Sequence, residues 1–119
     1  MAYFIDLPRF DDDRGGLCVV ENFLPFNVKR IYYIFNVKKE RGGHRHKKTI
    51  QALVSLSGSC EVFVNDGKEE NKYLLDEPHK CLIVEPEDWH TMDKFSKNST
   101  LLVMSSELYN SDDYIDDKY

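Results

Sequence analysis

Two histidines separated by a single residue, His44 and His46, are the side chains of this sequence best suited to chemistry. Residues i and i+2 of an extended strand project from the same face, so the two imidazoles would lie side by side. Such a pair suits either of two purposes. It ligates a metal ion, or it moves protons near pH 7, where the unperturbed pKa of histidine lies.

The residues that follow the pair distinguish these two chemistries. His46, Gln51 and Gly58 stand where the first cupin motif, HxH followed by Glu and then by Gly, has its second histidine, its acid and its glycine. The second cupin motif is represented only by Pro86, Trp89 and His90. A metal-binding cupin uses the Glu as an anionic ligand, and Gln51 is a poor ligand for a divalent transition metal. The sequence therefore favours a metal-free site in which neutral histidines exchange protons beside a carbonyl group.

The elements that must position these side chains are short strands, because apolar residues come in brief bursts between turn formers. The predicted strands are Leu17 to Glu21, Arg30 to Val37, Thr49 to Leu56, Cys60 to Val64, Lys72 to Leu75, Cys81 to Glu85, His90 to Phe95 and Leu101 to Ser105. The clearest hairpin signal is Asn65-Asp66-Gly67. We predict one all-β domain over residues 1–119, closed as the jelly-roll barrel of a cupin, with a short helix or a frayed end from Ser111 to Tyr119.

Side-chain alternation predicts which residues share the interior with the histidines. In one unbroken strand, His44 and His46 would lie on the same face as Ile50, Ala52, Val54 and Leu56. Gln51 would then face the other way, unless a bulge of the kind found at barrel rims intervenes.

Alternation also distinguishes two neighbouring tyrosines. Tyr33 belongs to an apolar face with Ile31, Phe35 and Val37, whereas Tyr32 lies on the other face with Arg30 and Asn36. Tyr32 is therefore the tyrosine that we expect near the histidines.

Composition excludes several classes of function. The formal net charge is -5, with Lys and Arg scattered among more numerous Asp and Glu, so we expect no nucleic-acid partner. The start of the sequence has no signal-peptide pattern and no stretch is apolar enough to cross a bilayer, so we expect a soluble, cytoplasmic protein without a membrane partner. Cys18, Cys60 and Cys81 are too widely spaced for a zinc motif and are expected to be reduced thiols within strands.

A larger set of ordered matches covers almost the whole sequence. The matching stretches are Asp13-Arg14-Gly15, Glu21, Pro25-Phe26, Lys29 to Ile34, Arg41-Gly42, His44, His46-Lys47, Gln51, Gly58 to Cys60, Asp66-Gly67, Trp89-His90, Phe95-Ser96, Ser105-Ser106, Tyr109 and Asp113 to Ile115. In these residues the chain resembles the sugar-nucleotide 3,4-ketoisomerases, metal-free cupins that act on dTDP-4-keto-6-deoxyglucose. The resemblance implies a cofactor-free homodimer that isomerises a 4-keto sugar nucleotide to its 3-keto isomer. It also implies a place in making the amino-deoxy sugars of surface glycans such as lipopolysaccharide, S-layer or capsule.

The resemblance also implies roles for individual residues. His44 and His46 would be the proton-transfer pair, with the assignment of base and acid open, and Tyr32 would be a hydrogen-bonding residue beside them. Arg14 and Arg41 would stabilise the enediolate or hold the diphosphate. The other residues expected to bind substrate are His90, Lys47 and Trp89. Arg14 and His90 resemble the branch of the family that forms the galacto-configured product.

Other interpretations of the same residues stay open at this point. A sugar-nucleotide 3,5-epimerase would also use a metal-free cupin with a histidine base, and a noncatalytic nucleotide-sugar binding module would use the same pocket without turnover. Arg14, which follows three aspartates, has the alternative of a solvated charge pair. His79 is expected on the surface, and Tyr109 and Tyr114 are either core or subunit-contact residues.

Overall fold

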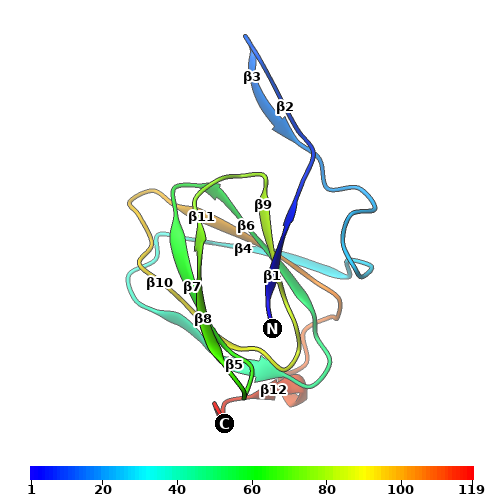
Figure 1. Ribbon diagram of the computed structural model, residues 1–119, viewed down its shortest axis with the longest axis vertical. Helices are drawn as coiled ribbons and strands as arrows, with labels where there is room; N and C mark the ends of the chain where they lie inside the picture. The colour runs from blue at the N-terminus through cyan, green and yellow to red at the C-terminus, as the bar shows by residue number, and fades with distance from the viewer.

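The computed structural model describes residues 1–119 and has two five-stranded antiparallel sheets that face each other, as predicted for a cupin (Figure 1). The strands are β1 (Tyr3–Asp6), β2 (Arg9–Asp12), β3 (Gly15–Cys18), β4 (Arg30–Phe35), β5 (Arg41–His46), β6 (Gln51–Ser57), β7 (Cys60–Asn65), β8 (Glu70–Leu75), β9 (Lys80–Val84), β10 (Trp89–Asp93), β11 (Thr100–Ser105) and β12 (Tyr114–Ile115). One sheet has the order β1-β9-β6-β11-β4 and the other β12-β5-β10-β7-β8, while β2 and β3 pair only with each other. The one helical element is a 3-10 turn, η1 (Ser111–Asp113). No helix has the length and apolar character of a membrane span.

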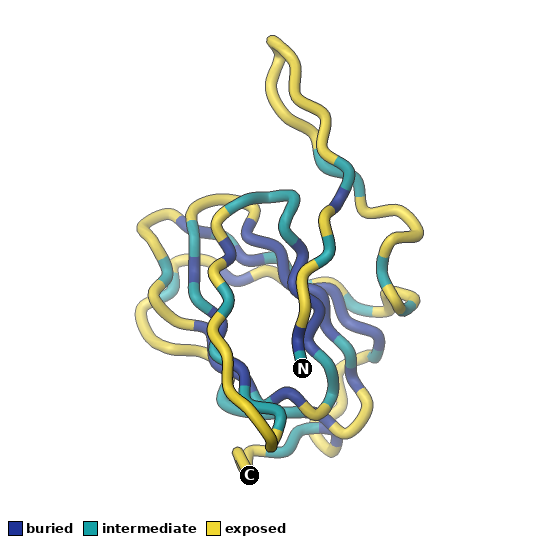
Figure 2. The backbone as a smooth tube through the Cα atoms, viewed as in Figure 1, coloured by how far each residue is buried: buried dark blue, intermediate teal, exposed yellow.

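The main core lies between the two sheets, where alternate residues of the facing strands meet. Leu53 and Val103 from one sheet and Val62 and Val64 from the other are almost completely buried there. Figure 2 shows the buried segments along these strands and the exposed residues in the loops around them. Burying a side chain of this size stabilises a fold by about 1.5 to 3 kcal/mol, so this layer holds the two sheets together.

Most predicted strands are present, and the differences lie near the two termini and at β5, which was not among the predicted strands. The strands β1 and β2 were not predicted, because each has only four residues and polar or charged neighbours. β1 is held by backbone pairing with β9, which a sequence pattern does not reveal. The predicted short helix of the C-terminal tail is present as the three residues of η1, and the tail is not frayed. It forms the short turn η1 and then β12, which pairs with β5.

The expectation of one unbroken strand from His44 to Leu56 is wrong. β5 ends at His46, and the chain crosses to the other sheet before β6 begins at Gln51. This crossing changes the side-chain parity, so Gln51 faces the interior whereas Ala52 and Val54 belong to a second apolar cluster with other residues of the outer face. A change of sheet, and not a bulge at Gln51, therefore turns this side chain inward.

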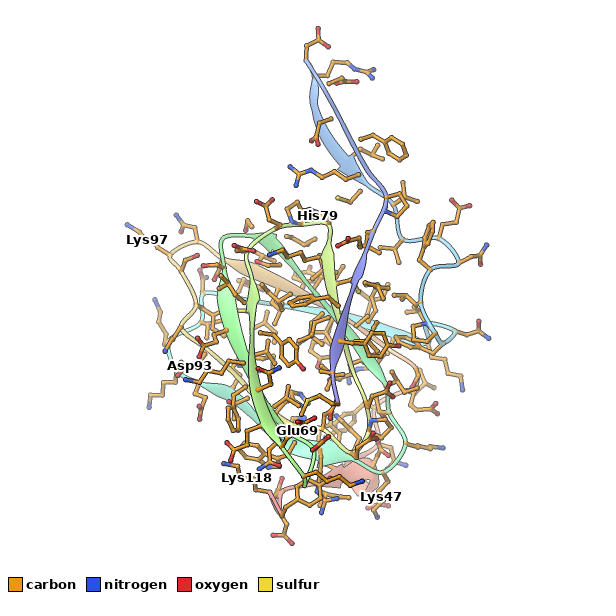
Figure 3. The ribbon with its side chains drawn as sticks, in the orientation of Figure 1. Lys47, Glu69, His79, Asp93, Lys97 and Lys118 are labelled. Carbon is orange, nitrogen blue, oxygen red and sulfur yellow. The ribbon has the colours of Figure 1, made fainter.

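The hairpin of β2 and β3 projects from one end of the molecule, opposite the end formed by β5 and β12 (Figure 1). Its base is fixed by Arg9, whose guanidinium donates to Glu77 at 3.0 Å and to Nδ1 of His79 at 3.1 Å. Beyond this base the apolar side chains of Phe10 and Leu17 are exposed. His79 is half-buried at this end of the molecule, away from the other histidines (Figure 3).

Two consecutive glycines set the position of His44 on β5. Gly42 and Gly43 have φ values of +88° and +85°, and the pairing of β5 with β10 shifts register beside them. A Cβ on Gly42 would lie 2.8 Å from the carbonyl oxygen of His90, whereas a Cβ on Gly43 would meet only Trp89 at 3.9 Å. The bulge therefore needs glycine at both positions for conformation, and at Gly42 also for space.

A pair of alanine variants separates these two requirements. Gly43→Ala introduces only an unfavourable φ, which lowers the free energy of unfolding by about 1 to 3 kcal/mol. We expect Gly42→Ala to be the less stable of the two, because its methyl group also collides with the β10 backbone. Urea denaturation followed by circular dichroism measures the difference. Equal stability of the two variants would contradict the close approach of Gly42 to His90.

Candidate active site

Three histidines meet inside the end of the barrel formed by β5 and β10. The centroid of the His44 ring lies 5.0 Å from that of His46 and 5.2 Å from that of His90, and the His46 and His90 rings are 6.3 Å apart. His46 and His90 are buried, and His44 is half-buried. Tyr114 of β12 packs its ring against His44 at 4.7 Å and against His46 at 4.6 Å. The predicted pair is thus a cluster of three imidazoles under one tyrosine.

The buried carboxylate of Asp113 holds His46 in place. Nδ1 of His46 lies 3.0 Å from Oδ2 of Asp113, which also accepts a hydrogen bond from the Thr49 hydroxyl. The other oxygen of Asp113 accepts from the backbone N–H of Lys48 at 2.9 Å. Burial raises the pKa of Asp113, but these hydrogen bonds outweigh burial and lower it below its ordinary value. Asp113 is therefore ionised at neutral pH.

Residues of the opposite sheet form the other wall. The side-chain amide of Gln51 donates to the hydroxyl oxygen of Tyr32 at 3.2 Å and to that of Ser105 at 3.4 Å. Because Tyr32 accepts this hydrogen bond, its own O–H is free to donate to another group. Burial raises the pKa of Tyr32, so the phenol keeps its proton. Alternation had predicted Tyr32, and not Tyr33, on this side.

The donor set does not resemble that of a metal-binding cupin. Gln51 stands at the position of the acidic ligand, and its amide is bound to Tyr32 and Ser105 on its own sheet. No group of three or more His, Cys, Asp or Glu side chains has an arrangement that could hold a metal ion.

The imidazoles of the cluster have depressed basicity. Burial, together with the neighbouring His46, lowers the pKa of His44 to about 4. Burial also lowers the pKa of His90 to about 4, although the carbonyl of Asp88, which accepts from Nδ1 of His90 at 3.0 Å, opposes the change. The pKa of His46 is lowered by burial too, while its contact with Asp113 raises it in part. All three rings are therefore neutral near pH 7 and able to accept a proton.

Arg30 is a cationic group of the site that the sequence reasoning did not select. Its guanidinium lies over the ring of Tyr32, 4.4 Å from the centroid, and 5.4 Å from that of Tyr109. The positive charge of Arg30 adds to the effect of burial in lowering the pKa of His46. At Tyr32 the charges of Arg30 and Arg41 offset only part of the rise in pKa that burial causes. Ion pairs form at Arg9 and Arg14, whereas Arg30 and Arg41 have no carboxylate partner. The alternation that placed Tyr32 inward could also have identified Arg30, two residues earlier.

Three of the predicted binding residues lie apart from the cluster within this chain. Arg14 lies in the exposed turn of the β2–β3 hairpin, paired with Asp12. Lys47 is exposed near the end where β12 joins β5 (Figure 3). Trp89 faces the outer side of its sheet, where Lys118 lies 5.1 Å from its ring centroid. The binding roles of these residues stay predictions.

Asp113 and Tyr114 are the contacts of the cluster that the sequence did not assign to the site. Both lie in a matching stretch of the resemblance, but no motif connects them to the histidines. His46 and Asp113 are 67 residues apart, and the backbone pair of Tyr114 with His46 forms only when the tail joins β5. Such a contact depends on the closed fold and leaves no periodic signal in the sequence.

Comparisons with known proteins agree on one family. A family model described as "FdtA: WxcM-like, C-terminal" matches residues 2–119. The chain is 43% identical over 115 residues to the TDP-4-oxo-6-deoxy-alpha-D-glucose-3,4-oxoisomerase of Aneurinibacillus thermoaerophilus, covering 93% of this chain and 83% of the relative. A 3,4-ketoisomerase from Helicobacter canadensis has a TM-score of 0.91 at 38% identity, covering 98% of this chain and 90% of that chain. A mutant of the 3,4-ketoisomerase QdtA from Thermoanaerobacterium thermosaccharolyticum, in complex with TDP-4-keto-6-deoxyglucose, has a TM-score of 0.94 at 35% identity, covering 98% and 87%.

The likeness to sugar-nucleotide epimerases is more distant. The rmlC epimerase of Mycobacterium tuberculosis has a TM-score of 0.81 at 19% identity, covering 95% of this chain and 66% of that chain. At this level of identity the likeness shows a common fold and nothing about activity.

The buried histidines predict a loss of stability in mild acid. The unfolded chain binds a proton at His90 below its ordinary pKa of 6.5, while the folded protein does not until about pH 4. Unfolding therefore takes up a proton in this window, and the free energy of unfolding falls as the pH is lowered through it, by on the order of 3 kcal/mol from His90. Urea denaturation at a series of pH values measures the slope. We expect His90→Asn to reduce it, and an unchanged slope in that variant would contradict the assignment.

Proposed function

This chain belongs to the FdtA family of sugar-nucleotide 3,4-ketoisomerases, and from that premise we propose that it converts dTDP-4-keto-6-deoxyglucose into a dTDP-3-keto-6-deoxyhexose. The relatives act on or bind TDP-linked sugars, which supports this substrate. We assign the activity to residues 1–119 as one domain. The new ketone on carbon 3 is the group that an aminotransferase requires, which supports a place in making the amino-deoxy sugars of surface glycans.

The reaction moves a ketone by one carbon with no net oxidation. A base removes the proton on carbon 3, and the electron pair of that C–H bond forms the double bond of an enediol(ate) across carbons 3 and 4. A proton then enters carbon 4, and the hydroxyl proton passes from the oxygen on carbon 3 to the oxygen on carbon 4. Substrate and product are isomers, so proton transfers alone complete the change.

The proposed proton carriers are His44 and His46. The observation that carries this proposal is the cluster of neutral, largely buried imidazoles, which face the phenol of Tyr32 across the interior. Neutral imidazole is the form that accepts a proton. Because the rings are largely buried, water does not screen their interaction with charge that develops on a bound substrate. The Tyr32 O–H is free to donate to an oxygen of the enediolate, because Gln51 donates to the Tyr32 oxygen.

Positive charge for an anionic group comes from Arg30 and Arg41. Neither arginine has a carboxylate partner. Arg30 lies over the Tyr32 ring, 4.4 Å from its centroid, so it is close enough to stabilise charge that develops beside Tyr32, and Arg41 is assigned to the same role through the resemblance. The same guanidinium groups suit the substrate diphosphate, which accepts paired hydrogen bonds. We propose that these arginines stabilise the enediolate and bind the diphosphate, and that Lys47 lies near the diphosphate.

We further propose the galacto configuration for the product. His90 lies 5.2 Å from His44, ring centroid to ring centroid, so an additional proton donor or acceptor stands beside the proposed pair. A third imidazole supports delivery of a proton to one chosen face of carbon 4. The resemblance also connects Arg14 with the galacto product. Within its own chain, Arg14 is paired with Asp12 in the turn of the β2–β3 hairpin, away from the histidines.

Two exposed apolar surfaces support a homodimer. One is the β2–β3 hairpin, where Phe10 and Leu17 are paired across the strands and exposed. The other is the outer face of β4, where Ile31, Tyr33 and Phe35 are each more than half exposed. Surfaces of this kind on a small domain mark protein contacts. We propose that a second copy of the chain covers them, so that the hairpin carries Arg14 to the partner subunit.

A single NMR experiment in heavy water tests the function. Incubation with dTDP-4-keto-6-deoxyglucose should yield a 3-keto isomer. Deuterium from the solvent should be incorporated at the sugar carbons that exchange protons. Because proton transfer by a positioned side chain contributes ~100 to 10,000-fold, His44→Asn and His46→Asn should each lower the rate by that order. The same spectra report the configuration at carbon 4.

The outcomes of this experiment separate the alternatives. Exchange at carbon 5 as well as at carbon 3 would indicate a 3,5-epimerase. Binding of the nucleotide sugar with neither exchange nor product would indicate a noncatalytic module and would overturn the isomerase proposal. Full activity in both histidine variants would exclude the pair as proton carriers.

Sedimentation velocity tests the homodimer. The wild-type protein should sediment at twice the 14.0 kDa mass of the chain. Removing apolar contact area with Phe10→Ser plus Leu17→Ser, or with Tyr33→Ser plus Phe35→Ser, should shift it toward the monomer. Leu74→Ser is the matched control, because Leu74 is also more than half exposed but lies on β8 of the other sheet. A wild-type monomer at all concentrations would contradict the proposal.

A further inference from the structure

Asp113 is a buried titratable group for which the proposed reaction has no direct use. Its side chain is 7% exposed and accepts hydrogen bonds from His46, from the Thr49 hydroxyl and from the N–H of Lys48. Burial of an isolated carboxylate opposes folding, so these three hydrogen bonds are what stabilise the Asp113 carboxylate in the interior. The contact with His46 connects the carboxylate to the proposed proton carriers.

The protonation of Asp113 determines which nitrogen of His46 carries the ring proton. An ionised carboxylate only accepts hydrogen bonds, so Nδ1 of His46 must be the donor across the 3.0 Å contact. In a neutral imidazole the other nitrogen, Nε2, then has a free lone pair. Nε2 of His46 is buried and has no hydrogen-bond partner within the protein. A lone pair without a partner inside the barrel is available to a substrate proton.

We propose that Asp113 is the positioning residue of His46, and that it fixes the Nδ1–H tautomer and the ring orientation so that Nε2 can take up and return a substrate proton. This inference rests on the proposed function. In the step itself an O–H or C–H bond of the substrate breaks, its electron pair stays on the substrate, and an N–H bond forms at Nε2. The resulting imidazolium is balanced by the Asp113 carboxylate, and the reverse step returns the proton to the isomerised sugar.

The other groups around His46 make the carboxylate necessary. The ionisable groups that face it from the neighbouring elements are Arg30, His44, His90 and Tyr114. The charge of Arg30 opposes protonation of His46, and so does burial. Asp113 supplies the opposing negative charge, so it preserves enough basicity for His46 to hold a proton during the reaction.

The C-terminal segment anchors Asp113 at several points. Its backbone carbonyl accepts from the N–H of Lys47 at 2.9 Å, one residue after His46. Further along, the Asp116 carbonyl accepts from the indole N–H of Trp89 at 3.0 Å, and the Asp117 carbonyl accepts from Nε of Arg45 at 3.0 Å. The carboxylate is thus held by contacts on both sides of the histidine, as a positioning role requires.

The test replaces the carboxylate with an amide of the same shape. The amide of Asp113→Asn can accept from Lys48 or Thr49 with its oxygen, but its N–H groups would donate toward Nδ1 of His46 and favour the Nε2–H tautomer. We expect kcat to fall by roughly 100 to 10,000-fold with little change in KM, because the wrong tautomer blocks Nε2. The acidic limb of the pH profile should also move to lower pH, since loss of the carboxylate lowers the pKa of His46 further. Asp113→Glu, which keeps a carboxylate, should recover part of the rate.

Nitrogen-15 NMR of histidine-labelled protein tests the tautomer without substrate. Wild-type His46 should have a protonated Nδ1 and an unprotonated Nε2, and Asp113→Asn should reverse the two. Asp112→Asn is the matched control, because Asp112 is the exposed neighbour in η1 and should preserve both tautomer and rate.

The outcomes distinguish this inference from the proposed function. A wild-type Nε2–H tautomer, or full kcat in Asp113→Asn, would overturn the positioning role. The expected tautomer in a wild-type protein that fails to isomerise the sugar would contradict the isomerase activity alone. If Asp113→Asn does not fold, the wild-type tautomer still decides the inference.

Discussion

Burial of several imidazoles beside one another is the constraint on which the rest of this site depends. Burial disfavours the charged form of each ring, and neighbouring imidazoles add to this effect at His44 and at His90, so these two rings stay neutral far below their ordinary pKa. Neutral rings accept protons, but an imidazolium formed during a reaction requires compensation. Asp113 provides that compensation at His46, which makes the carboxylate and the ring a unit within an otherwise weakly basic cluster.

The strands achieve this arrangement through two local features. The glycine bulge at Gly42 and Gly43 brings β5 close to the backbone of His90, so that residues from neighbouring strands meet at ring-to-ring distance. The chain then changes sheets directly after His46, and Gln51 enters the opposite wall only five residues later. One short segment therefore supplies both walls of the site, which is why its sequence is so informative about function.

The sequence predicted the parts of the site that follow from alternation and spacing. His44 and His46 are two residues apart on one strand, and Tyr32 lies inward for the same reason, so a period of two was sufficient to find them. Asp113 could not be found in this way, because its contact with His46 closes only when the tail pairs with β5. The first strand of the hairpin, β2, was missed because its four exposed residues have no core to face. The change of sheet after His46 also lay beyond the reach of periodicity, and it reversed the predicted orientation of Gln51.

Gln51 illustrates how one residue type can set the chemistry of a shared fold. A glutamate at this position would be a buried anion that needs a cation or another positive partner. The amide is neutral and donates to the hydroxyl oxygens of Tyr32 and Ser105, which joins three strands of one sheet and leaves the Tyr32 proton free for another acceptor. The negative charge near the histidines comes instead from Asp113, behind the Nδ1 side of His46. Moving the carboxylate from the metal-ligand position to that side favours proton transfer over metal binding.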